Sequence, residues 1–145
     1  MDNIQILAMS FDDFNEIEPI FSDFDDFWST QNLKSELENI NSKYIVAKLE
    51  NKIVGFSGIW FSVDDAHITN IVVHKNFRHN GIGSKMLERL IDIAKHYNKT
   101  SLTLEVNTKN NDAQKLYFKY GFENLGIRKK YYKNLDDAYI MTLHF

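Results

Sequence analysis

Two glycines, Gly81 and Gly83, stand where an apolar strand passes through a polar loop into a long amphipathic helix. Glycine lets the backbone approach a ligand closely because no Cβ stands in the way. The first N–H groups of a helix have no partner inside it, and the helix dipole favours negative charge beside them. Residues 71–84 therefore predict an anion site, and a pyrophosphate would suit it.

The same glycines could serve only to turn the chain into the helix, and a Gly-x-Gly pair alone favours that simpler interpretation. The pattern is not the dinucleotide-binding fingerprint, because no third glycine follows at the required offset. It is not a P-loop either, because Lys85 lacks the full glycine spacing before it. The segment must therefore be judged with its surroundings.

Glu105 and Tyr117 are the side chains best suited to acid–base chemistry. Glu105 interrupts an apolar strand between Leu104 and Val106, and strand alternation predicts that its side chain points away from theirs. Such a carboxylate is either solvated on an open face or placed for chemistry, and the strand pattern alone favours the first. Tyr117 lies on the helix face opposite its charged neighbours and, taken alone, indicates a core residue.

Hydrophobic periodicity predicts the elements that must position these residues. Strands are predicted at residues 4–8, 44–49, 53–61, 66–73, 102–106, 122–128 and 138–144, with a hairpin turn at Asn51-Lys52. Helices are predicted after the capping residue Ser10, from about Thr30 through Leu37 and Ile40, at residues 81–96, and at residues 112–120 before Gly121. The order β-α-α-β-β-β-α-β-α-β-β favours one central sheet covered on its faces.

With these elements in place, the segment Arg78-x-x-Gly81-x-Gly83 resembles motif A of the GCN5-related N-acetyltransferase (GNAT) superfamily. Leu104-Glu105-Val106, Asn110 and the run from Leu116 to Phe122 resemble the second cofactor motif of that superfamily. Phe27-Trp28-Ser29, the run from Ile127 to Tyr132 and the run from Asp137 to Met141 are similar to the bacterial ribosomal-protein-alanine N-acetyltransferases (RimI type). His74-Lys75 and Lys133-Asn134 depart from that pattern, which usually has a proline in each place.

The resemblance implies a mixed α/β (α+β) fold: one GNAT-like domain over residues 1–145, with a mostly antiparallel, twisted central sheet of about seven strands. Helices would cover both faces, and two splayed parallel strands would hold coenzyme A. A bulge in the strand that contains residues 71–73 would open the splay, so that the pantetheine arm pairs with main chain like an added strand.

The resemblance also assigns roles to residues. Glu105 would be the general base that deprotonates the amine, and Tyr117 the general acid that protonates the leaving thiolate. A backbone N–H of residues 71–73 would polarise the thioester carbonyl. The implied cofactor-binding residues are Ile71, Val72, Val73, Arg78, His79, Asn80, Gly81, Ile82, Gly83, Ser84, Asn110 and Tyr117.

Other side chains admit simpler interpretations. Asn110 could cap the helix that follows it instead of binding pantetheine. Trp28, Tyr131 and Tyr132 would line a groove for the acceptor, or pack in the core. The histidines, His67 among them, form no metal-ligand spacing with carboxylates and are interpreted as surface residues, so no metal is expected.

Bulk composition narrows the function further. The chain has no Cys, so a cysteine nucleophile and a covalent cysteinyl intermediate are excluded. The net charge of −3 argues against a general nucleic-acid binder. We expect no signal peptide and no membrane span, a cytoplasmic location, and a monomer or weak homodimer.

The expected reaction is direct acetyl transfer from acetyl-CoA to a primary amine in a ternary complex. The resemblance favours the N-terminal α-amine of a ribosomal protein as acceptor. An acetyltransferase for a small amine (a polyamine, an amino acid or an antibiotic) is the first alternative. A non-catalytic CoA-binding module is the second, and the presence of both Glu105 and Tyr117 argues against it.

Overall fold

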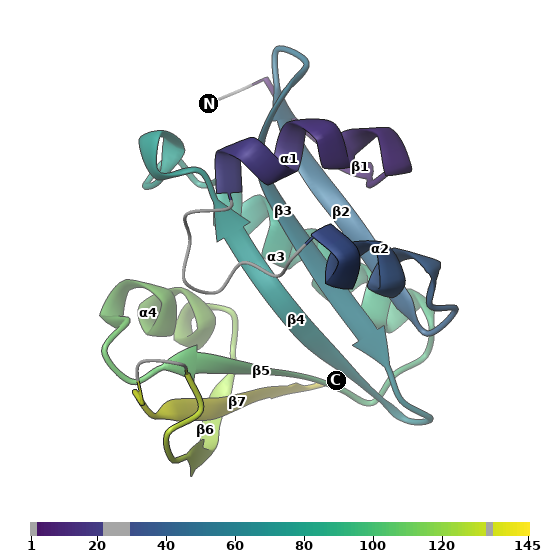
Figure 1. Ribbon diagram of the computed structural model, residues 1–145. Coiled ribbons are helices and arrows are strands. Elements are labelled where there is room, and N and C mark those ends of the chain that lie inside the picture. Colours follow the sequence, from purple (N-terminus) through teal and green to yellow (C-terminus); the bar gives the residue numbers. More distant parts are fainter. Residues whose placement is uncertain (1–2, 22–29, 133–134) are drawn as a thin grey trace.

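One seven-stranded sheet forms the centre of the molecule in the computed structural model, which describes residues 3–21, 30–132 and 135–145 (Figure 1). The elements in chain order are β1 (Ile4–Ala8), the 3-10 turn η1 (Phe11–Asp13), α1 (Phe14–Phe21), α2 (Thr30–Glu38), β2 (Ser42–Leu49), β3 (Lys52–Phe61), β4 (Asp65–Val73), the 3-10 turn η2 (Lys75–Phe77), α3 (Ile82–His96), β5 (Ser101–Asn107), α4 (Asn111–Lys119), β6 (Glu123–Arg128) and β7 (Ala138–His144). The strand order across the sheet is β1-β2-β3-β4-β5-β7-β6. The predicted mixed fold is therefore confirmed.

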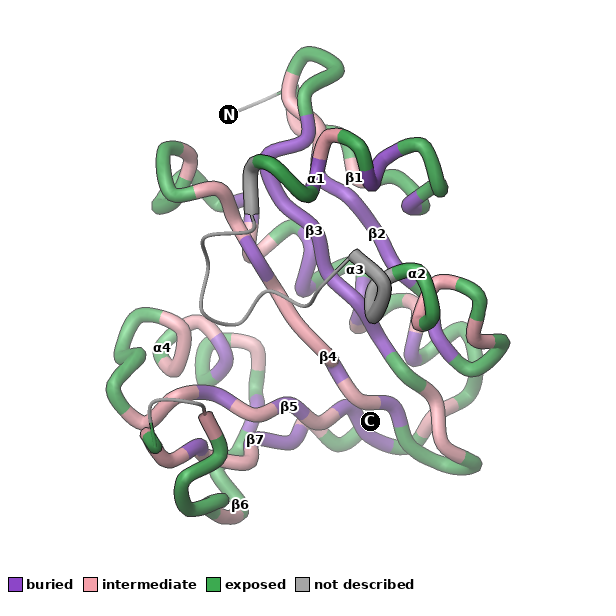
Figure 2. The backbone as a smooth tube through the Cα atoms, viewed as in Figure 1, coloured by how far each residue is buried: buried purple, intermediate pink, exposed green. Residues whose placement is uncertain are grey.

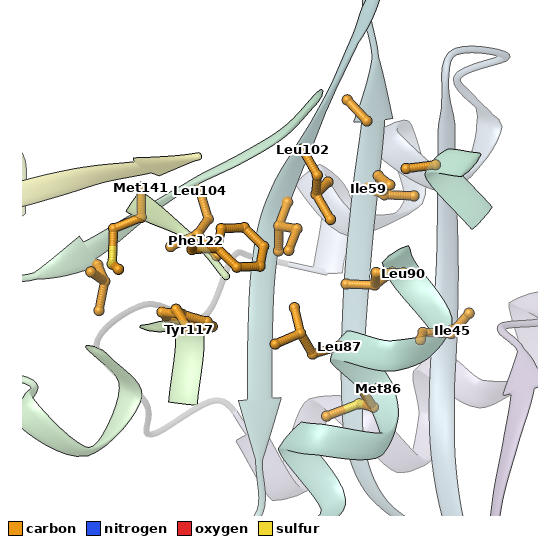
Figure 3. Close-up of a cluster of buried hydrophobic side chains, with 14 of the residues drawn as sticks. Ile45, Ile59, Met86, Leu87, Leu90, Leu102, Leu104, Tyr117, Phe122 and Met141 are labelled. Atoms are coloured by element: carbon orange, nitrogen blue, oxygen red, sulfur yellow. The ribbon is translucent and has the colours of Figure 1, made fainter. Parts of the chain in front are cut away.

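Helices cover both faces of this sheet. Helices α1 and α2 lie on one face, where Phe14 and Ile17 of α1 pack on β2 and β3. Helices α3 and α4 lie on the other, where Met86 and Leu90 of α3 and Tyr117 of α4 share a core with β5 and β7 (Figure 3). The buried residues of α3 recur at three- and four-residue spacing, which is why this stretch forms one amphipathic helix.

Two local predictions were wrong by a few residues. The turn between β2 and β3 consists of Glu50 and Asn51, not Asn51 and Lys52, because both take left-handed backbone angles (φ 52° and 67°), as a two-residue hairpin turn requires. Ile40 does not belong to the apolar face of a helix. Helix α2 ends at Glu38 in a tight turn, where the Asn39 N–H donates to Glu36, and Ile40 is left 94% exposed.

The sheet opens at its centre because the parallel ladder between β4 and β5 is short. Every other neighbouring pair of strands is antiparallel, whereas β4 and β5 pair in parallel over only three positions, from Asp65 with Ser101 to His67 with Thr103. Beyond His67 the two strands diverge (Figure 1). The middle of β4 is consequently half-buried although β4 is the fourth of seven strands (Figure 2).

A bulge in β4 lies where the divergence begins. Gly58 of β3 pairs with Asn70 and Ile59 with Ile68, so Thr69 is an extra residue without a partner on β3. The Tyr44 hydroxyl lies 3.1 Å from the Thr69 hydroxyl, and the Ser57 hydroxyl donates to the Asn70 carbonyl at 2.6 Å. Side chains from β2 and β3 therefore hold the bulge in place. The bulge was predicted in this strand, and it lies just before Ile71.

The bulge and its tyrosine need a glycine at position 58. A Cβ on Gly58 would overlap the Tyr44 ring and approach the Thr69 hydroxyl at 2.5 Å. We expect Gly58→Ala to lower the free energy of unfolding by about 1–3 kcal/mol, the usual cost of overpacking a core. Urea unfolding measures this change.

Gly126→Ala is the matched control, because a Cβ there would meet the Ile140 side chain at an ordinary 3.5 Å. Equal unfolding free energies for the two variants would contradict the proposed packing of Tyr44 on the bulge.

Candidate functional site

The loop between β4 and α3 ends in a helix N-terminus with unpaired N–H groups. Gly81 precedes the helix with φ 79°, a left-handed angle that favours glycine. The first bond of the helix runs from the Lys85 N–H to the Gly81 carbonyl at 3.1 Å. The N–H groups of Ile82, Gly83 and Ser84 therefore have no partner within the helix, an arrangement that suits an anion, and the binding of a pyrophosphate here stays a prediction.

The loop before Gly81 is held by side-chain hydrogen bonds and is positively charged. The Arg78 Nε donates to the Val73 carbonyl at 3.2 Å, and the Asn80 amide donates to the carbonyls of Phe77 and Arg78. His79 next to it takes a left-handed angle of 64°. Burial lowers the pKa of His74, and nearby cations that include Arg78 lower it further. This positive surrounding and the helix N-terminus would both attract a phosphate group.

Gly83 lies where α3 packs against α4 and β4. A Cβ built on it would meet only the Leu116 and Val73 side chains, both at an ordinary 3.9 Å. The fold does not need a glycine at this position. The close approach of a ligand to the helix backbone at this position stays a prediction.

The predicted carbonyl-binding segment lies on the diverging part of β4. Residues Ile71, Val72 and Val73 pair with β3 on one side, and the ladder to β5 has already ended at His67. The β5-facing main chain of this segment therefore has no partner in the sheet. It is a strand edge to which an extended, amide-containing ligand could bind.

The Glu105 carboxylate lies on the face of β5 opposite the buried Leu104 and Val106, as strand alternation predicted. Its side chain is only 10% exposed, and its Oε1 lies 3.5 Å from His67 Nε2 and 3.5 Å from Arg128 Nε. Arg128 belongs to β6, so its side chain reaches Glu105 across the intervening β7. Both potential cations meet the same carboxylate oxygen.

These neighbours keep the carboxylate ionised. The hydrogen bond from His67 lowers the pKa of Glu105, burial opposes that effect, and the charges of His67 and Arg128 lower the pKa further. An ionised carboxylate can accept a proton, although its lowered pKa makes Glu105 a weak base.

Tyr117 lies on the other side of β5. Its ring is 8% exposed and packs against Phe122 at 5.8 Å between ring centroids (Figure 3). Burial raises the pKa of Tyr117 to about 12, so the hydroxyl keeps its proton at neutral pH. A protonated hydroxyl can serve as a general acid, although the same burial suits a core residue.

Asn110 adopts the simpler of its two predicted roles. It precedes α4, and its side-chain oxygen accepts a hydrogen bond from the Ala113 N–H at 3.2 Å. Its contact with pantetheine stays a prediction.

The predicted acceptor residues are joined to Glu105 through Arg128. The Arg128 guanidinium lies over the Tyr131 ring at 5.7 Å, and the Tyr131 and Tyr132 rings meet edge to face at 5.0 Å. Tyr131 is 47% exposed. An aromatic surface therefore adjoins the carboxylate. Trp28, the third predicted acceptor residue, lies outside the described residues.

Two residues near this carboxylate, and one beside the bulge, were not predicted from the sequence. His67, interpreted as a surface residue, contacts Glu105, and Arg128 was noted only as part of a motif. The Asn70 Oδ1 beside the bulge is buried and has no hydrogen-bond partner among the described residues. Only the register of β4 on β5 could have signalled His67, because the pairing with Thr103 places it two residues from Glu105 on the neighbouring strand.

The described ranges contain no group of three His, Cys, Asp or Glu side chains that could hold a metal ion. Among the same residues, no helix has both the length and the apolar character needed to span a membrane.

Known proteins resemble the chain in sequence and in fold. The Acetyltransferase (GNAT) family matches residues 7–122. The ribosomal protein bS18-alanine N-acetyltransferase of Haemophilus ducreyi is 34% identical over 123 residues, which cover 81% of this chain and 83% of that protein. The crystal structure of the ribosomal-protein-S18-alanine N-acetyltransferase from Escherichia coli superposes with a TM-score of 0.88 at 28% identity, covering 97% of this chain and 93% of that one.

A third similarity concerns the cofactor. A GNAT family acetyltransferase from Elizabethkingia anophelis, crystallised with acetyl-CoA bound, has the same fold, with a TM-score of 0.80 at 22% identity and full coverage of both chains. The family match covers most of this chain and includes both the glycine loop and the Glu105 strand. The protein therefore belongs to the GNAT family and is an acetyl-CoA-dependent N-acetyltransferase.

Proposed function

We propose that this enzyme acetylates the N-terminal α-amine of a protein that begins with a small residue, and that ribosomal protein bS18 is the kind of chain it receives. The observation that carries the proposal is the ionised Glu105 beside the exposed aromatic surface of Tyr131 and Tyr132. The similarity to bS18-alanine acetyltransferases over four-fifths of the chain supports the same acceptor. We also propose that residues 1–145 act as one domain.

The base strength of Glu105 favours an α-amine over a lysine side chain. An α-ammonium has a pKa near ~8, whereas a lysine ammonium has a pKa near ~10.4. The neighbours of Glu105 lower its pKa and thereby make it a weaker base. Every base removes a proton more easily from the more acidic ammonium, and a weak base depends on this difference most. The α-amine is therefore the better acceptor for Glu105.

When bound, acetyl-CoA supplies the acetyl thioester. The N–H groups of Ile82, Gly83 and Ser84 would hold its pyrophosphate, and the open edge of β4 at residues 71–73 would hold the pantetheine arm and polarise the carbonyl. Glu105 would take a proton from the acceptor ammonium. Tyr117 would give its proton to the departing thiolate and would regain one from the nitrogen of the tetrahedral adduct. Its raised pKa keeps that proton on the hydroxyl at neutral pH.

The first prediction tests the pyrophosphate site. Gly83→Val should keep the fold, because a Cβ there would meet its neighbours only at an ordinary 3.9 Å, yet it should block the approach of phosphate to the helix N-terminus. We expect calorimetry to show a loss of acetyl-CoA affinity and circular dichroism to show an unchanged fold. If the folded variant binds acetyl-CoA with undiminished affinity, the pyrophosphate does not bind at this position.

The second prediction tests the acid and the base. Glu105→Gln removes the proton acceptor at constant size and should lower kcat/KM by roughly 10²–10⁴ at neutral pH, the usual span for a positioned acid–base group. Tyr117→Phe should also slow turnover, and least with thioesters whose thiol is a good leaving group. Both variants should bind acetyl-CoA normally.

The outcomes for the two residues are independent. Near-normal turnover of Glu105→Gln would assign the base to another group. An equal loss for good and poor leaving groups would leave Tyr117 a purely structural role.

The third prediction concerns the acceptor. Thiol release should be fastest with peptides that begin with Ala or another small residue, because the α-amine must come within ~3–3.5 Å of the thioester carbon. Blocking the α-amine should abolish the reaction, and an internal lysine should not restore it. Mass spectrometry locates the acetyl group on the product.

Two results would overturn the acceptor. If polyamines or free amino acids outperform every peptide, the enzyme is a small-amine acetyltransferase. If acetyl-CoA binds but no amine is acetylated, the protein is a CoA-binding module.

A further inference from the structure

The proton that Glu105 takes from an amine must leave again before the next turnover. The Glu105 side chain is 10% exposed, so water reaches it poorly. Its Oε1 is in contact with two side chains that are themselves more exposed, His67 at 39% and Arg128 at 53%. Among the described residues, these two are the groups that connect the carboxylate to solvent.

Of these two side chains, only His67 can accept a proton and release it again. A guanidinium stays protonated at every pH at which an enzyme works, so Arg128 can hold the carboxylate but cannot relieve it of a proton. An imidazole gains and loses a proton within the physiological range, and its two nitrogens allow uptake on one side and release on the other. The Nε2 of His67 faces Glu105 at 3.5 Å, and the ring is partly open to water.

We propose that His67 is the proton exit of this enzyme, taking the proton from Glu105 and releasing it to solvent. The acceptor ammonium gives one proton to the Glu105 carboxylate, which leaves a neutral amine and a carboxylic acid. The carboxylic acid then gives that proton to the Nε2 of a neutral His67 whose own proton is on Nδ1, which restores the carboxylate and forms an imidazolium. The imidazolium loses the proton to water. His67 acts through Glu105 and is a positioning and relay residue.

Charged groups from several strands surround this pair. Asp65 lies two residues before His67 on β4 and accepts hydrogen bonds from Thr100 and Ser101. Those two bonds lower the pKa of Asp65 most, and the charges of His67 and of His144 on β7 lower it further. Glu105 on β5 contacts the imidazole, and Arg128 on β6 contacts the same carboxylate oxygen of Glu105.

The relay rests on the proposed function, and His67→Gln tests it in the full-length enzyme. Glutamine places an amide near the position of Nε2, so it can still donate to Glu105 but cannot carry a proton. We expect kcat to fall about tenfold, less than the ~10²–10⁴ of a direct acid–base group, with acetyl-CoA affinity unchanged. Added imidazole buffer should restore kcat, and the pH dependence of kcat should change, because a proton-carrying side chain is lost.

His144→Gln is the matched control, because it removes another imidazole close to Asp65 without touching Glu105. It should keep the wild-type kcat, pH profile and insensitivity to imidazole. If His67→Gln also keeps the wild-type profile, or if its deficit does not respond to imidazole, His67 only packs beside Glu105 and the relay is wrong.

A second measurement separates the relay from the choice of acceptor. Carbon-13 NMR of the Glu105 side-chain carboxyl, assigned with Glu105→Gln, follows its titration without turnover. The His67 hydrogen bond is the main influence that lowers the pKa of Glu105, so the midpoint should rise in His67→Ala, which removes that bond. An unchanged midpoint overturns the relay whatever the acceptor. A raised midpoint with no amine acetylated would reject the proposed function and still support the coupling of the two side chains.

Discussion

The early end of the ladder between β4 and β5 is the constraint on which the rest of this structure depends. Three paired positions hold the two halves of the sheet together, and beyond them each strand presents an open edge. A continuous ladder would occupy the main chain of residues 71–73. The divergence instead leaves that main chain available beside the N-terminus of α3 (Figure 1).

Side chains of β2 and β3 hold this opening in place from one side. The extra residue Thr69 shifts the register of β4, and a buried tyrosine and a buried serine bind the bulge through their hydroxyls. Burial raises the pKa of Tyr44 to about 12, so the hydroxyl that meets Thr69 stays neutral at neutral pH. Gly58 allows the tyrosine ring to lie across β3. The bulge is thus supported by the fold without any ligand.

Local pattern predicted most of the fold, because periods of 3.6 and 2.0 depend only on near neighbours in sequence. It also predicted which face of β5 carries Glu105. It could not predict the environment of that carboxylate, since His67 and Arg128 lie 38 and 23 positions away in the chain and meet it only through strand order and register. The shifts at Glu50 and Ile40 have local causes, a left-handed turn and an early helix end, that hydrophobic periodicity does not report.

The placement of Glu105 and Tyr117 on opposite faces of the sheet bears on how products would leave. The carboxylate faces the α1 and α2 side with Tyr131 nearby, whereas the tyrosine ring packs among residues of the α3 and α4 side. In the proposed mechanism the acetyl group crosses the plane of the sheet while its donor and its acceptor stay on their own sides. In that mechanism the two products would leave from opposite faces of the sheet.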